Sequence, residues 1–427
     1  MSDFNRQLLV ENDAPHWLAP MREQGRARWA ETVKPTRKTE DWKYTSLHLL
    51  DREFAAAPKH LGADVSDLPS LDGPRLVFLD GHLQTDISDI ALPAGVALVR
   101  FADADEQQAA AIQQHLGSGI LEDRHVFANL NNATLSDGVF LHLSANADMG
   151  APLHIVYANS GAEPAFTVNQ RLLVVLEANA RGHVIEHFTG HGVAAFTNGI
   201  TELLLGPGAQ LKHRRLHCED GGAMHIGGVH ARLERNSHLD SFHLALGSEL
   251  KRLDLVIHHA GSGAHCDLNG IYLLRGTEHV DYHSTIEHAV PHCTTDEVFR
   301  GVIADDASAV FNGRIHIHAD AQKTRAELSN KNLLTSSNAE INTKPELEIY
   351  ADDVQCAHGA TVAQLDEGML HYLRTRGVGR DEAEVMLSYG FINELVENLD
   401  HEALRNFLHP LLAQHLSRDP ELIRHLT

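Results

Sequence analysis

The chain has 427 residues, with 35 basic and 58 acidic side chains and a formal net charge of −23. This charge argues against nucleic acid and anionic membranes as main partners. There is no run of 18 apolar residues and no apolar stretch at the N-terminus, so we expect a soluble, cytoplasmic protein without a signal peptide. Four cysteines in a chain of this length do not form a disulfide framework, which fits a reducing compartment.

The first 50 residues have a helical pattern. Residues 17–29 place apolar groups on one side and charged groups on the other, which predicts an amphipathic helix. Residues 35–47 mix basic, acidic and aromatic side chains, and we expect a surface loop anchored by Trp42 and Tyr44.

Two further elements complete an N-terminal mixed α/β domain, predicted over residues 1–120. Residues 75–83 read as strand, turn and strand, with Asp80-Gly81 as a strong hairpin signal. Residues 103–116 are rich in Ala and Gln and predict a short helix.

A repeat of short strands dominates residues 121–362. Gly182, Gln210 and His238 occupy equivalent places in three copies at equal intervals along the sequence, although later copies drift from this spacing. Stacked repeats bury a continuous apolar column, so the sequence predicts a parallel β-helix. A pair of antiparallel sandwiches is the alternative. The open end of a β-helix needs a cover, because exposed strand edges recruit other chains.

Helical patterns return in a C-terminal domain, predicted over residues 363–427. Leu365, Met369, Tyr372 and Leu373 form the first of three apolar stripes. Two interpretations remain open: a helical cap that packs on itself and on the last rung, or a docking module for a partner protein.

Motifs for enzymatic chemistry are missing. No G-x-x-x-x-G-K-[ST] loop is present, so the chain should not hydrolyse ATP, and neither H-E-x-x-H nor C-x-x-C occurs. The acidic pairs Asp305-Asp306 and Asp352-Asp353 stand at turn positions, where Asp favours local backbone hydrogen bonds. An exported-type β-helix carbohydrate-active enzyme is therefore a weaker alternative.

The chain contains 32 histidines, and we expect most of them to be solvated residues on strand faces. A His-rich metal-binding protein is the alternative interpretation. Cys218, Cys266 and Cys293 each directly follow a His, and neighbours in a strand point to opposite faces, so we expect core thiols beside exposed imidazoles. His316 and His318 share a strand face and could bind a metal, but we expect them only to make that face polar toward solvent.

The strongest candidate site is Cys356 with His358. The alternation that begins at residue 345 predicts a strand, and Cys356 follows the turn at Asp352-Asp353. Residues i and i+2 of a strand share a face and lie roughly 6–7 Å apart at their backbones. A thiolate and an imidazole suit iron, zinc or sulfur chemistry, but two ligands do not complete a tetrahedral site. Further ligands must come from elsewhere, including another chain.

Three stretches carry a resemblance to a known family: residues 37–45 (RKTEDWKYT), 356–361 (CAHGAT) and 374–383 (RTRGVGRDEA), with Phe391 downstream. Residues 296–302 and Asn330-Lys-Asn332 add further agreement. The chain resembles the SufB/SufD family of the SUF iron–sulfur cluster assembly machinery over nearly its whole length, and the N-terminal motif points to the D branch.

The resemblance implies a right-handed parallel β-helix with N-terminal and C-terminal helical parts. It implies a non-catalytic scaffold that pairs with SufB through the β-helices and binds the ABC-type ATPase SufC through its C-terminal helices. ATP-driven pairing of SufC would open the B–D interface for cluster assembly. His358, with Cys356 beside it, would contribute to a transient iron or iron–sulfur site shared with SufB. A homodimer of the isolated chain is left open.

One position departs from the SufB pattern. An ungapped match places Asn330 where SufB carries its essential cysteine. The interval from Asn330 to His358 equals the interval from Gly182 to Gln210, so the two positions are expected to stack on adjacent rungs. Gly359 replaces a Glu of the paralogue. Both differences favour the D type and imply that this subunit alone cannot hold a full cluster.

Overall fold

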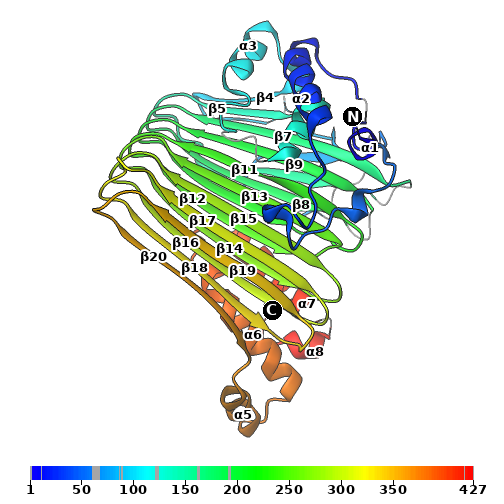
Figure 1. Cartoon of the computed structure of the whole chain (residues 1–427), viewed down its shortest axis with the longest axis vertical. Helices are drawn as coiled ribbons and strands as arrows, with labels where there is room; N and C mark the ends of the chain where they lie inside the picture. Colours follow the sequence, from blue (N-terminus) through cyan, green and yellow to red (C-terminus); the bar gives the residue numbers. More distant parts are fainter. Residues whose placement is uncertain are drawn as a thin grey trace.

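The computed structural model describes residues 2–10, 12–59, 68–85, 87, 90–120, 125–160, 164–190, 194–417 and 419–426. A stack of two-stranded rungs runs through the molecule, with the N-terminal helices at one end and the C-terminal helices toward the other (Figure 1). The predicted parallel β-helix is confirmed, because the strands of each sheet pair in parallel from one rung to the next.

The rungs alternate between two sheets, A and B. Sheet A contains, in spatial order from the first rung, β4 (Val96–Arg100), β5 (Val139–Leu143), β7 (Phe166–Leu176), β9 (Phe196–Leu205), β11 (Met224–Leu233), β13 (Leu250–His259), β15 (His279–His288), β17 (Ser308–Ile317) and β19 (Glu340–Ile349), with β1 (Ala55–Ala56) beside β7. Sheet B contains β3 (His82–Leu83), β2 (Arg75–Leu79), β6 (Leu153–Ala158), β8 (Arg181–Thr189), β10 (Gln210–His217), β12 (His238–Leu246), β14 (His265–Leu274), β16 (Thr294–Ile303), β18 (Arg325–Leu334) and β20 (Gln355–Gln364).

The register between rungs corrects the predicted period. Gln210 pairs with His238 as predicted, but its partner on the preceding rung is Arg181 and not Gly182. The offset also varies, because the pairing of Ser308 with Glu340 spans a longer interval of sequence than the pairing of Met224 with Leu250. A shift of one residue moves a side chain to the opposite face, so a fixed period cannot assign every inward position.

The N-terminal strands close the first rung. β4 pairs antiparallel with β5, and β2 pairs in parallel with β6. β2 also forms the predicted hairpin with β3. Both hairpin residues, Asp80 and Gly81, have positive φ, as this tight turn requires. The predicted boundary at residues 120/121 adjoins residues 121–124, which lie outside the described part of the chain, and stays a prediction.

The segment of residues 37–45 lies against the outer face of sheet A. Trp42 is buried, with the Arg252 guanidinium 4.1 Å from its ring centre. Thr45 donates a hydrogen bond to Asp281 (2.5 Å). Tyr44 is 42% exposed, so it does not anchor the segment as predicted. The buried Trp42 ring and several polar contacts to sheet A hold this loop.

Helices precede and follow the strands of the solenoid in the sequence. Their bounds are α1 (Asp3–Gln7), α2 (Ala19–Glu31), α3 (Glu106–His115), α4 (Val126–Thr134), α5 (Glu367–Thr375), α6 (Arg380–Glu397), α7 (Glu402–Leu416) and α8 (Pro420–Ile423). α2 and α3 confirm the two helices predicted before residue 120. None of the described helices combines the length and apolarity needed to cross a bilayer.

The C-terminal helices cover the outer face of sheet B rather than the last rung. Ile392 and Leu395 of α6 pack in one apolar cluster with Phe242, Ile271 and Val302 of the sheet. Arg300 also donates to the Phe391 carbonyl oxygen (2.6 Å), which joins β16 to α6. The predicted cap packs on itself, but it lies on the flank of the solenoid and leaves the terminal rung uncovered.

Candidate functional site at the open end of the solenoid

The last rung is formed by β19 and β20, which lie at the ends of their sheets. Within the described residues, β19 pairs only with β17 and β20 only with β18. Tyr350 and Val362 are 64% and 50% exposed beside this edge. Strands of the same chain close the first rung, whereas the last rung of the described stack leaves one edge of each sheet unpaired.

Cys356 and His358 share one face of β20, as the sequence predicts. Their Cα partners on β18 are Ala326 and Leu328, which are both buried between the sheets. Both side chains therefore point toward the solenoid interior, but the missing next rung leaves His358 exposed and Cys356 only half-buried. Burial raises the pKa of the Cys356 thiol, and a backbone hydrogen bond with Ala326 opposes that rise.

Asn330 does not stack on His358. Its Cα partner on β20 is Ala360, two positions beyond His358, because the offset between β18 and β20 is longer than the predicted period. The difference is even, so Asn330 keeps its inward face, and it is fully buried.

A ring of hydrogen bonds occupies the Asn330 side chain. Asn330 donates to the Tyr272 hydroxyl (2.9 Å), Tyr272 donates to Asn332 (2.5 Å), and Asn332 donates to the Asn330 carbonyl oxygen (2.7 Å). Thr343 of β19 donates to the same oxygen (2.8 Å). This network ties the last rungs together, and it was not predicted from the sequence. The same-face spacing of Asn330 and Asn332 was the available signal.

Asp305 and Asp306 stand at a turn as predicted, but the hydrogen bonds that their side chains accept come from other rungs and not from the local backbone. Asp305 has a positive φ and accepts a hydrogen bond from the Gly276 backbone (2.8 Å). Asp306 accepts one from Asn338 (2.9 Å). The first acidic pair is thus used in turns between rungs.

A minority of the described histidines depart from the predicted solvated positions. His213, His217 and His225 are buried inside the solenoid, so solvated strand faces do not account for them. Glu186 accepts hydrogen bonds from His213 (2.9 Å) and Arg215 (2.8 Å). Burial alone would raise the pKa of Glu186, but Arg215 and His213 hold it down at about 2. The interior is polar at this level because charged groups pair within it.

The three cysteines that follow a His are buried, which confirms them as core thiols. His265 and His292 reach solvent, but His217 is buried against the Phe188 ring, so the prediction of an exposed imidazole is wrong there.

His316 and His318 do share a face, and both contact one carboxylate oxygen of Glu287, at 2.6 and 2.8 Å. Arg314 binds the other oxygen of Glu287 (2.7 Å). This surface group is an internally paired network.

Among the described residues, four groups of three or more side chains could hold a metal ion, and neither Cys356 nor His358 belongs to one. Within that part of the chain, the terminal pair therefore lacks further ligands. Fold and site together define a β-helix scaffold with a thiol and an imidazole at an open edge.

The chain belongs to the SufBD family. Residues 157–391 match the family described as "SUF system FeS cluster assembly, SufBD core domain", and residues 4–155 match the "SufBD protein N-terminal region". The resemblance found in the sequence motifs is thus confirmed.

Curated relatives cover almost the whole chain. The iron–sulfur cluster assembly protein SufD of Escherichia coli is 30% identical over 93% of this chain and 93% of its own length. A SufBD family protein of Synechocystis is also 30% identical, over 88% of this chain and 86% of its own. SufD of Bacillus subtilis is 24% identical over 95% of both chains.

Proposed function

We propose that this chain is a non-catalytic, SufD-type scaffold subunit for iron–sulfur cluster assembly in the cytoplasm. The open terminal rung carries the argument, because its inward-facing Cys356 and His358 offer two ligands where the described part of the chain supplies no third. A partner β-helix that covers the rung would pair with the free edges of β19 and β20 and complete the ligand set. SufB is the partner that the family suggests. Family membership and four free cysteines support the cytoplasmic location.

Chemically, the pair suits an iron ion or a nascent cluster as cargo. An imidazole and a thiolate both bind iron, and a tetrahedral site needs two more donors. Because His358 is exposed and Cys356 is half-buried, both can reach a partner's ligands with little movement. The cargo would be held only while both chains meet, so no cofactor belongs permanently to this subunit.

His358→Ala tests the shared site. The variant should assemble with SufB and SufC, because His358 lacks packing that the fold needs, but cluster maturation in the complex should fall at least tenfold. His48→Ala, which alters an exposed histidine of the N-terminal part, is the matched control and should mature clusters normally. A His358→Ala complex that matures clusters at the wild-type rate would refute the proposed role.

The docking site for the ATPase is proposed on α5. This helix buries only Leu370, and it leaves Met369 and Tyr372 54% and 56% exposed. α5 also extends beyond the end of the solenoid, away from the helices that pack on sheet B (Figure 1). An amphipathic helix with an exposed apolar face is a common element of helix-in-groove recognition.

Tyr372→Asp tests this surface by co-purification with SufC. We expect retention of the ATPase to drop at least tenfold, because burying a new charge in an apolar contact is costly. Val33→Asp places the same charge at an apolar residue that is 84% exposed in the N-terminal part, and it should retain the ATPase fully. Equal retention by both variants would remove α5 from the proposed interface.

A further inference from the structure

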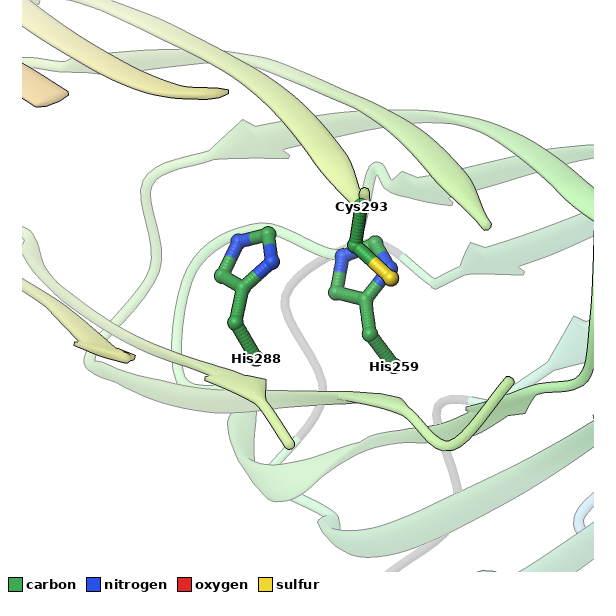
Figure 2. A group of neighbouring side chains, drawn as sticks. All are labelled: His259, His288 and Cys293. Atoms are coloured by element: carbon green, nitrogen blue, oxygen red, sulfur yellow. The ribbon is translucent and has the colours of Figure 1, made fainter. Parts of the chain in front are cut away.

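Three buried donor side chains meet at one corner of the solenoid, away from the terminal rung. His259 ends β13, His288 ends β15, and Cys293 directly precedes β16. One potential ligand atom from each lies within 4.8 Å of the others. Figure 2 shows the Cys293 sulfur beside the His259 ring, with the His288 ring next to it. His288 and Cys293 lie at the corner between β15 and β16 of one rung, and stacking of the preceding rung adds His259.

The two histidines interrupt an apolar column. Leu233, His259, His288 and Ile317 are paired successively across four rungs, and all four are buried. The flanking rungs fill this position with Leu and Ile, which need no hydrogen bonds. Burying an imidazole is unfavourable unless its nitrogens find partners. Two adjacent histidines at such a position therefore point to a ligand.

One nitrogen of each imidazole is unsatisfied. The Nε2 atoms of His259 and His288 lie 2.9 and 3.1 Å from the Thr295 hydroxyl. Their Nδ1 atoms are buried and have no hydrogen-bond partner. When the Thr295 oxygen accepts a hydrogen bond from both Nε2 atoms, both Nδ1 lone pairs are free for coordination, and the hydroxyl holds the two rings in place.

The third donor is also weakly engaged. The Cys293 thiol contacts the Gly261 carbonyl oxygen at 3.5 Å and that of Pro291 at 3.7 Å, and a thiol is a weak hydrogen-bond donor. The Cys293 side chain is fully buried, so water does not supply it with further hydrogen bonds. A metal ion would engage the sulfur more strongly than either carbonyl oxygen does.

We propose that His259, His288 and Cys293 form a structural binding site for a thiophilic transition-metal ion such as Zn²⁺. One sulfur and two imidazole nitrogens select such ions over Mg²⁺ or Ca²⁺, which prefer oxygen donors. On binding, the Cys293 thiol releases its proton to solvent and the thiolate occupies one coordination position, with no change in oxidation state. The ion would link two successive rungs at the corner.

The environment keeps both imidazoles in the form that binds metals. Burial lowers the pKa of His288 to about 3, and burial followed by the neighbouring His288 holds the pKa of His259 well below its usual range. Both rings are thus neutral at pH 7, as metal ligands must be.

The surface groups differ in a way that favours this corner. In the group of His238, His265 and Asp267, both imidazoles already contact one Asp267 oxygen, at 2.9 and 3.0 Å. The group around Glu287 is paired in the same manner. The side chains of these surface groups are paired with one another, whereas the Nδ1 atoms of His259 and His288 have no hydrogen-bond partner and can act as metal ligands.

Cobalt binding to the full-length chain tests the proposal. Cys356→Ser serves as the background, because it removes the half-buried thiol of the terminal rung and separates this site from the shared one. Addition of Co²⁺ should give one equivalent of bound ion with sulfur-to-cobalt charge-transfer absorption. Cys293→Ser in that background should abolish the absorption, and Cys218→Ser, which alters another buried thiol after a His, should retain it. Absorption that survives Cys293→Ser, or that never appears, would overturn the proposal.

X-ray absorption of the zinc-loaded Cys356→Ser chain gives a second test that leaves the site intact. We expect one sulfur at about 2.3 Å and two imidazole nitrogens at about 2.0–2.1 Å from the zinc ion. A shell of nitrogen and oxygen alone would refute the assignment, whether or not the Cys293→Ser chain folds.

Discussion

At the residue scale, the use of polar atoms distinguishes structural from functional side chains. Asn330 and His358 both face inward on sheet B, but the Asn330 amide takes part in a closed ring with Tyr272 and Asn332. His358 is exposed on the last rung. Residue type and position alone suggested a relation between Asn330 and His358, whereas the hydrogen bonds assign Asn330 to stability and leave His358 accessible to a ligand.

Asn330→Ala should destabilise the chain by about 2–4 kcal/mol, because it leaves buried groups of Tyr272, Asn332 and Thr343 without a partner. Asn342→Ala provides the control. That side chain makes one exposed hydrogen bond, to Glu340 (2.7 Å), and its loss should change stability by less than about 0.5 kcal/mol. Urea unfolding midpoints measure both effects, and equal midpoints would argue against a structural role for the ring.

Buried histidines should make the fold sensitive to mild acid. Burial, and then the neighbouring His187, lowers the pKa of His154 to about 3. Between pH 6.5 and 3 the unfolded chain binds a proton at this residue and the folded chain does not, so the unfolding free energy falls as pH falls. Above pH 6.5 the His154 side chain is neutral in both the folded and the unfolded chain, so it no longer lowers the unfolding free energy.

The acid sensitivity has a measurable slope. His154 alone contributes up to about 1.4 kcal/mol per pH unit within that window. His154→Leu removes the titrating group, so urea unfolding between pH 4 and 6 should show a correspondingly shallower dependence on pH. A slope that equals the wild-type slope would mean that His154 is not held neutral in the folded chain.

At the element scale, helices with similar apolar patterns serve different purposes. α6 buries Ile392 completely against sheet B, whereas α5 leaves Met369 more than half exposed. The sequence predicts both helices from their helical periodicity. It does not predict which apolar face has a partner within the chain, since that depends on where each helix lies relative to the sheet.

Substitutions in the two helices should separate these roles. Ile392→Ala should lower the unfolding free energy by about 2–4 kcal/mol through the cavity that it leaves. Met369→Ala should change it by less than about 0.5 kcal/mol, since an exposed side chain leaves no cavity. Urea midpoints of the two variants provide the comparison, and a large loss for Met369→Ala would show that α5 packs on its own chain.

At the scale of the whole molecule, the two ends of the solenoid differ. The N-terminal strands β2 and β4 pair with the first rung, while β19 and β20 remain open. The C-terminal helices lie on the flank of sheet B, so they do not hide the open end. The described solenoid thus has one closed end and one open end, and the open end is where the proposed pairing with a second β-helix would occur.

The open end should also allow self-association when no partner is present. We expect the isolated chain to form homodimers at high concentration through β19 and β20. Val362→Lys adds a charge at a residue of β20 that is 50% exposed, and it should raise the dimer Kd at least tenfold, or by about 1.4 kcal/mol. Sedimentation velocity measures this shift, with Val33→Lys as the control. Dimers that resist Val362→Lys would place the contact elsewhere.

The sequence by itself determined the features that depend on local patterns. Alternation and turn residues predicted a parallel β-helix, the helical segments on either side of it, and the shared face of Cys356 and His358. These properties are set within a few residues, so they need no knowledge of distant contacts.

Only the tertiary structure decided which residues meet across rungs. Unequal offsets between successive rungs place Asn330 beside Ala360 and bring His259, His288 and Cys293 to one corner. The tertiary structure also placed α6 and α7 on sheet B and left the terminal rung open. The physical reason is that loops of unequal length set the stacking register, so a fixed period that errs by one residue assigns a side chain to the wrong face.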